Sequence, residues 1–154
     1  MIILIDSGLL GLRCNPNATE TSAQFMRWFD KCLIRTNVVS SQICDYEVKR
    51  GLLLAQKQNL QSGGLAILAD LHDIIDFLPV SETILDVAAE LWSSVRLRGQ
   101  PTASENSLDA DVIIGATYQD LVANNLGQEV VIATTNVRHI SRYAVAVEWQ
   151  ELAI

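Results

Sequence analysis

The sequence predicts an α/β protein in which a central parallel sheet lies between two layers of helices. Short, continuously apolar runs at residues 2–5 and 130–133 are typical of strands buried on both faces. These runs alternate with longer segments whose apolar residues recur at helical spacing, a pattern typical of parallel strands joined by right-handed crossovers. We therefore expect a three-layer α/β/α sandwich.

The first half of the chain begins with the strand at 2–5, which stops where Asp6 is followed by serine and glycine. Residues 18–35 carry an apolar stripe at helical spacing, and a brief strand is expected at 37–39. Residues 42–58 repeat the helical spacing and form the next expected helix. Strand, helix, strand and helix thus follow one another in the order that a parallel sheet requires.

The second half continues the alternation. Residues 65–74 and 82–98 show helical periodicity, and the strand expected between them at 76–80 is closed by Pro79. After a long loop, residues 109–124 are apolar on nearly all sides, as expected of a helix packed between other elements. The remaining strands are expected at 130–133 and 145–147.

Length and composition set further limits. The 154 residues, 49% of them hydrophobic, predict one globular domain over residues 1–154. Eleven basic against eighteen acidic residues give a net charge of −7, so a nucleic acid would have to be held by a bound cation or a small basic patch. Three widely spaced cysteines argue against a disulfide framework, and no apolar run is long enough to span a membrane. We expect a cytoplasmic protein with no membrane partner.

Polar residues with oxygen ligands follow two of the expected strands. Asp6 ends the first strand, and Thr134, Thr135 and Asn136 follow the strand at 130–133. In parallel α/β sheets the working site lies beyond the carboxyl ends of the strands. Glu47 borders the apolar stripe of its helix and can therefore face this edge of the sheet.

Two further acids, Asp109 and Asp111, open the buried helix. Structural alternatives exist for the acidic residues. Asp6 can be a turn residue or a helix cap, Glu47 can pair with a neighbouring cation such as Arg50, and Asp109 can cap its helix. Asp111 is harder to explain this way, because it precedes a continuous apolar stretch and burial of an unpaired carboxylate is costly.

If Asp6, Glu47 and Asp111 converge, their like charges require a cation between them. Oxygen ligands suit Mg²⁺ or Mn²⁺ better than zinc. Such an ion would attract a phosphate group and lower the pKa of a bound water, so an acidic protein could still cleave an acidic polymer.

Four motifs in order carry a resemblance to a known family: Asp6 after the apolar strand, Glu47 in Tyr-Glu-Val-Lys-Arg-Gly, Asp111 in Asp-Val-Ile-Ile-Gly-Ala, and Asn136 in Thr-Thr-Asn-Val-Arg-His. Together they resemble PIN-domain proteins, most closely VapC-type toxins. The resemblance spans nearly the whole chain. It implies a PIN-like fold, Mg²⁺- or Mn²⁺-dependent endoribonuclease activity on RNA, a homodimer, and inhibition by a small antitoxin protein in a type II toxin–antitoxin pair.

The resemblance also assigns roles to residues. Asp6, Glu47 and Asp111 take the family's catalytic, metal-binding positions, Asp109 is an outer ligand, and Asn136 stands where many members carry a fourth acid. A carboxamide binds cations more weakly than a carboxylate, so this position departs from the more acidic version of the motif.

Thr135 and Arg138 are expected beside the RNA. His139 can also reach the RNA backbone, although packing is its more common role, and Arg13 is a weaker candidate for the same contact.

Other phosphate-binding α/β folds fit the sequence less well. The expected strand ends lack the aspartate and lysine of a receiver domain, and Gly8 and Gly11 do not make the Rossmann glycine pattern. Gly8 also stands where a haloacid-dehalogenase phosphatase needs a second aspartate. The remaining alternative is a catalytically weak PIN-like module that binds a partner.

Overall fold

The computed structural model describes residues 1–15, 19–60, 63–99 and 109–154. Within these ranges the strands are β1 (Ile2–Ile5), β2 (Asn37–Ser41), β3 (Asp76–Leu78), β4 (Val130–Thr134) and β5 (Ala146–Glu148). The helices are α1 (Ser7–Cys14), α2 (Glu20–Arg35), α3 (Gln42–Lys57), α4 (Gly64–Leu71), α5 (Glu82–Leu97), α6 (Ala110–Asn124) and α7 (Val137–Ile140).

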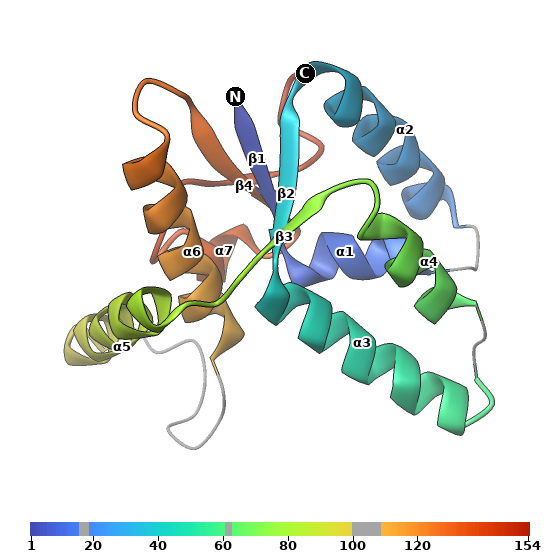
Figure 1. Cartoon of the computed structure of the whole chain (residues 1–154), viewed down its shortest axis with the longest axis horizontal. Coiled ribbons are helices and arrows are strands. Elements are labelled where there is room, and N and C mark those ends of the chain that lie inside the picture. The colour runs from blue at the N-terminus through green and yellow to red at the C-terminus, as the bar shows by residue number, and fades with distance from the viewer. Residues whose placement is uncertain (16–18, 61–62, 100–108) are drawn as a thin grey trace.

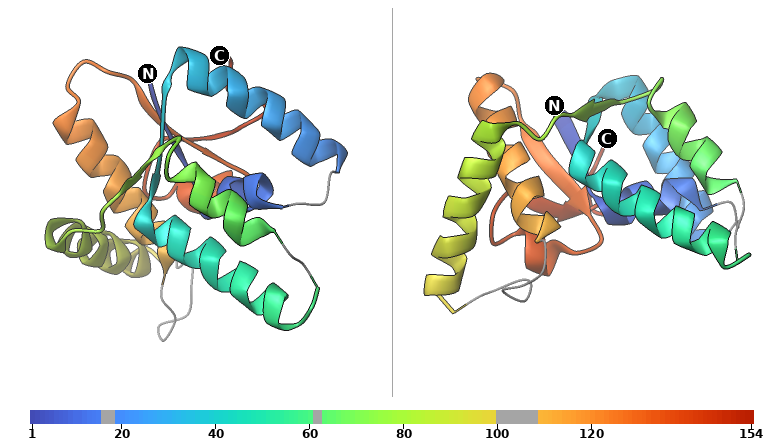
Figure 2. Two further views of the ribbon diagram at one scale, coloured as in Figure 1. Left: turned by 45° about the vertical axis from the view of Figure 1, so that its right-hand side comes forward. Right: turned by 60° about the horizontal axis from the view of Figure 1, so that its bottom comes forward.

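The strands form one parallel sheet in the order β3-β2-β1-β4-β5. Helices α1 to α4 lie on one side of the sheet, and α5 and α6 lie on the other (Figures 1 and 2). The expected α/β/α sandwich is therefore confirmed. Strands β1 and β4 lie inside the sheet and are buried along their whole length, which explains the apolar runs at 2–5 and 130–133.

The core lies on both faces of β1, where Ile3, Leu4 and Ile5 have no exposed surface. On one side, the aromatic rings of α2 pack against Trp149, which follows β5; its indole meets the ring of Phe25 edge to face at a centroid distance of 5.4 Å. Burial of these side chains fixes where the strands end, and so fixes the edge at which the polar residues gather.

Close packing of α6 explains why this helix is apolar on nearly all sides. Eight of its residues are buried. A Cβ added at Gly115 would lie 2.4 Å from Cβ of Tyr143, so glycine lets the two segments approach closely. This packing holds the first turn of α6 against the sheet.

Two helices depart from the expectations. Helix α1 follows β1 at once and was not expected, because its two glycines lower its helix propensity; packing against α2, α3 and α4 outweighs that cost. Helix α7 has one turn and gives no periodic signal. Helix α2 begins at Glu20, after a capping box formed by Thr19 and Ser22; residue 18, the expected start, lies outside the described ranges.

Smaller corrections concern the ends of elements. Helix α4 ends at Leu71 instead of residue 74, and β3 ends at Leu78. Proline has no N–H to donate to a ladder, so the strand stops before Pro79 and does not reach residue 80. The three cysteines, Cys14, Cys32 and Cys44, are free and buried, as their spacing indicated. No helix in the described ranges has the length and hydropathy needed to cross a membrane.

Candidate functional site

The carboxyl ends of β1, β2, β4 and β5 meet at one edge of the sheet. At this edge β1 leads into α1, β2 leads into α3, and β4 leads into α7 (Figure 1). The first turn of α6, which carries Asp111, belongs to the same region, because the charges of Asp6 and Glu47 act on that carboxyl group. The topology thus gathers the expected acids from three elements: the end of β1, helix α3 and the start of α6.

Asp6 is the most deeply buried of these acids, with 5% of its surface exposed. Its Oδ1 accepts a hydrogen bond of 2.9 Å from the backbone N–H of Leu9, so Asp6 caps α1. Its Oδ2 accepts a 2.5 Å hydrogen bond from the hydroxyl of Thr134. Burial raises the pKa of Asp6 above its usual value, although the Thr134 hydroxyl and the Leu9 amide oppose the rise.

Thr134 connects the ends of β1 and β4. This threonine has no exposed surface. Its hydroxyl donates to Asp6, and its Oγ1 accepts a 2.7 Å hydrogen bond from the backbone N–H of Asn136. One buried hydroxyl therefore fixes both the carboxylate of Asp6 and the chain that leads into α7.

The exposed residue Thr135 lies beside the same carboxylate. A Cβ added at Gly8 would lie 3.1 Å from Oγ1 of Thr135 and 3.3 Å from Oδ1 of Asp6. The two side chains therefore flank one small volume at the start of α1. This placement agrees with the role expected of Thr135 near a substrate.

Asp111 lies in the first turn of α6, with about a quarter of its side chain exposed. Burial raises its pKa, and the negative charges of Asp109, Asp6 and Glu47 raise it further. Nδ1 of His139 lies 3.5 Å from Oδ2 of Asp111, and a positive His139 opposes the rise. The other three acids predicted from the sequence therefore lie within electrostatic range of Asp111.

Two structural alternatives describe the observed contacts correctly. Asp6 is a helix cap, as noted above. Glu47 accepts a 3.1 Å hydrogen bond from Arg50, one helical turn further along α3. Glu47 nevertheless stays half-buried and its charge reaches Asp111, so the ion pair and a place in the site are compatible.

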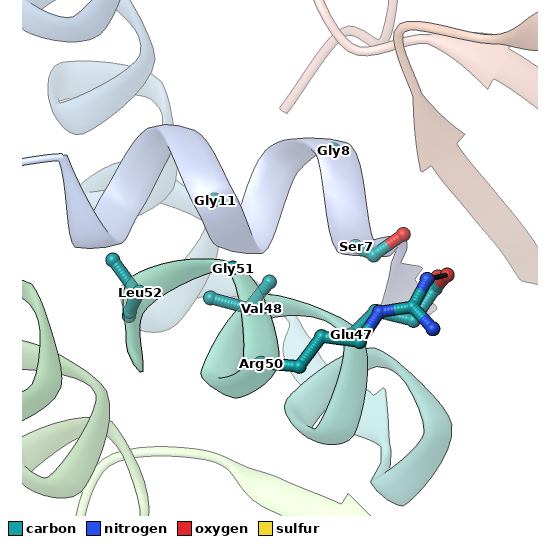
Figure 3. Close-up of a pocket in the computed structure, with 8 residues that line it drawn as sticks. All are labelled: Ser7, Gly8, Gly11, Glu47, Val48, Arg50, Gly51 and Leu52. Atoms are coloured by element: carbon teal, nitrogen blue, oxygen red, sulfur yellow. Dashed lines mark hydrogen bonds and ion pairs between the residues drawn. The ribbon is translucent and has the colours of Figure 1, made fainter. Parts of the chain in front are cut away.

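An open groove of about 370 Å³ runs from this acidic edge between α1 and α3. Arg50 and Glu47 lie at one end of the groove, next to Ser7 (Figure 3). A Cβ added at Gly11 or Gly51 would meet nothing within 4 Å, so these positions face open space. The complete lining is Ser7, Gly8, Gly11, Glu47, Val48, Arg50, Gly51 and Leu52.

Asp109 and Asn136 take the positions that precede α6 and α7, and neither side chain makes a capping hydrogen bond. The expectation that Asp109 caps its helix is therefore wrong for its side chain. Arg138 is exposed on α7, as a residue that contacts RNA would need to be. Arg13 lies in the last turn of α1, about 10 Å along the helix axis from Asp6, and is not brought to the edge.

Two residues at the acidic edge, His139 and Glu148, differ from what the sequence predicted. His139 is 39% exposed, and its Nδ1 lies 3.5 Å from Oδ2 of Asp111, so its ring faces the acidic edge. Glu148 ends β5, and its charge raises the pKa of Asp6. Glu148 was not predicted from the sequence, although the strand-end rule that selected Asp6 and Asn136 also selects it.

The donor set fits a hard divalent cation by its chemistry, since the expected ligands are carboxylate, amide and hydroxyl oxygens. In the described ranges, no three Asp, Glu, His or Cys side chains are close enough together to form a ready metal site. Glu47 and Asp111 instead face the in-chain partners Arg50 and His139. Side chains would therefore have to move inward around an ion.

Comparisons with known proteins identify the fold. No family model matches the sequence, and no curated protein matches it. Among solved structures, VapBC2 from Rickettsia felis, bound to a DNA fragment from its promoter, contains a similar chain with a TM-score of 0.70 and 14% identity. The match covers 97% of this chain and 99% of that one.

FitAcB from Neisseria gonorrhoeae gives a TM-score of 0.64 at 21% identity, with 97% of this chain and 99% of that chain covered. VapBC-1 from nontypeable Haemophilus influenzae gives 0.65 at 16% identity, with 98% and 100% covered. The chain therefore has the fold of these VapBC and FitAcB chains, and the PIN-like α/β/α architecture expected from the four motifs is confirmed.

Proposed function

We propose that this protein is a Mg²⁺- or Mn²⁺-dependent endoribonuclease that hydrolyses phosphodiester bonds of RNA, and that it is the toxin of a type II toxin–antitoxin pair. One observation carries the proposal. Asp6, Glu47 and the pair Asp109 and Asp111 come from three parts of the chain, and the charges of the other three acids reach Asp111 at the carboxyl edge of a parallel sheet. The shared fold with VapBC chains supports it.

In this proposal Asp6, Glu47 and Asp111 hold the cation, with Asn136 as a weaker, neutral ligand and Asp109 as an outer ligand. A divalent ion bound there supplies positive charge for the phosphate and lowers the pKa of an attacking water. Thr134 keeps the carboxylate of Asp6 in place through its hydrogen bond.

The two residues expected beside RNA contribute from the β4–α7 segment. Thr135 offers a hydroxyl next to Asp6, and Arg138 offers an exposed guanidinium to the RNA backbone. Because the protein has a net charge of −7, these local contacts and the cation have to overcome a general repulsion of RNA.

The proposal includes a small antitoxin as partner and a homodimer as the assembly, both of which the VapC resemblance implies. The alternative is a catalytically weak module that binds a partner. Two observations favour it: Asn136 is neutral where a fourth acid would strengthen the site, and Arg50 and His139 already face two of the acids.

Cleavage of a labelled single-stranded RNA separates these functions. The endoribonuclease proposal predicts cleavage with Mg²⁺ or Mn²⁺ and none with EDTA. Asp6→Asn and Asp111→Asn keep size and hydrogen-bonding capacity, so each should lose more activity than the roughly 10–100-fold that loss of an outer-shell partner causes. Asp70→Asn, at an exposed position of α4, is the matched control.

Near-parental cleavage by both site variants would overturn the catalytic assignment. Absence of metal-dependent cleavage by the parent chain would favour the partner-binding module.

A further inference from the structure

Glu148 is the last residue of β5, and the register of the sheet places it at the acidic edge. Strands β4 and β5 are parallel, with Thr134 opposite Glu148. The backbone N–H of Trp149 donates a 3.3 Å hydrogen bond to the carbonyl oxygen of Thr134, which continues the pairing past the strand end. Register partners in neighbouring strands point to the same face.

That face is the one from which Thr134 reaches Asp6. The hydroxyl of Thr134 donates to Oδ2 of Asp6. The last register pair of β1 and β4 is Ile5 opposite Ala133, and Asp6 and Thr134 are the next residues along the two segments. Asp6, Thr134 and Glu148 therefore follow one another across three adjacent strands at the same level. Successive side chains along a strand point to opposite faces of the sheet. Trp149 packs on Phe25 of α2, so its neighbour Glu148 points to the face opposite α2.

Glu148 also differs from the other acids in its contacts. Glu47 is paired with Arg50, and Asp111 faces His139. The carboxylate of Glu148 makes no hydrogen bond or ion pair with any residue in the described part of the chain, although its side chain is half-buried. An unneutralised charge beside a buried carboxylate is stabilised by a cation.

We propose that Glu148 is a further ligand of the divalent cation, directly or through a water, and that it supplies the negative charge which Asn136 does not. This inference rests on the proposed function. It makes the site asymmetric: the added charge comes from β5, on the far side of β4 from Asp6, and not from the start of α7.

Titration calorimetry of the whole chain with MnCl₂ tests the proposal, using Glu148→Gln. The matched control is Glu151→Gln, three residues further along and exposed. Loss of an outer metal partner weakens affinity by about 10–100-fold, so Glu148→Gln should weaken Mn²⁺ binding by at least about tenfold. Glu151→Gln should bind like the parent.

Thermal melting in EDTA separates a ligand from a structural residue. Removing a like charge from beside Asp6 relieves repulsion, so Glu148→Gln should melt in EDTA at or above the parental midpoint. Asn136→Asp in the same chain should restore much of the lost Mn²⁺ affinity, because it returns one negative charge to the edge.

Each of three results would overturn the inference. If the parent binds Mn²⁺, Asp6→Asn abolishes binding and Glu148→Gln binds like the parent, this inference is wrong and the proposed metal site stands. A lower melting point of Glu148→Gln in EDTA with unchanged Mn²⁺ affinity would likewise overturn it, in favour of a structural role. If the parent shows no Mn²⁺ binding at all, both the inference and the proposed metal site are wrong.

Discussion

Replacing Thr134 by valine removes one hydroxyl and keeps the shape of the side chain. In the native protein that hydroxyl donates to the carboxylate of Asp6 and accepts from the N–H of Asn136. A hydrogen bond to a charged group contributes about 1.5–3 kcal/mol, and leaving a buried donor unsatisfied costs about 1–3 kcal/mol. Asn136 is partly exposed, so water replaces part of its loss. We expect Thr134→Val to lower the free energy of unfolding by about 2–4 kcal/mol at pH 7.

The loss should depend on pH. Because the pKa of Asp6 is raised above its usual 3.8, the native state binds this proton more tightly than the unfolded state, and the carboxyl group lowers stability as the pH rises through the folded pKa. The Thr134 hydroxyl limits that rise, so its removal should raise the folded pKa further. The stability deficit of Thr134→Val should therefore grow from pH 4 to pH 7.

Urea denaturation in EDTA at the two pH values measures this deficit. Thr134→Ser keeps the hydroxyl and is the matched control, so its deficit should be small and independent of pH. An equal deficit for valine at pH 4 and pH 7, or a pH-dependent one for serine, would refute the role assigned to this hydrogen bond.

Three further predictions follow from the same geometry. Asn136→Asp adds a negative charge at the edge and should tighten Mn²⁺ binding while lowering stability in EDTA; calorimetry and melting check both, and no change in either would place Asn136 outside the site. Gly115→Ala should destabilise the chain by about 1–3 kcal/mol in urea denaturation, because the added methyl would lie 2.4 Å from Cβ of Tyr143. Burial raises the pKa of Cys44 to about 12, so this thiol should react with a disulfide reagent at pH 8 only after denaturation; rapid reaction in the native protein would contradict its burial.

The sequence pattern predicted those elements whose local composition favours the same structure as their packing in the fold. The run at β1 is apolar because both of its faces are covered, so its pattern reports its environment directly. Helix α1 shows the opposite case. Gly8 and Gly11 weaken it as an isolated helix, and its stability comes from contacts with other helices that no local pattern reveals.

The candidate site was predictable where one rule applied. The carboxyl ends of parallel strands gave Asp6 and Asn136, but the same rule was not carried to Glu148, whose strand is three residues long. The partners of the acidic side chains were not predictable from the sequence. The pattern allowed Glu47 to pair with Arg50 or to face the sheet edge, and in the structure it does both. The pairing of His139 with Asp111 depends on how α7 packs against α6, a long-range contact.

The central claim is that the acidic edge of the sheet holds a divalent cation. Thermal melting of the whole chain in EDTA and in Mn²⁺ at about 100 times its dissociation constant tests it most directly. A ligand that binds the folded state alone stabilises it by about 2.7 kcal/mol at this excess. We therefore expect the melting midpoint of the parent to be several degrees higher in Mn²⁺ than in EDTA. The midpoint of Asp6→Asn should be the same in Mn²⁺ and in EDTA. Identical parental midpoints in EDTA and in millimolar Mn²⁺ would contradict the account.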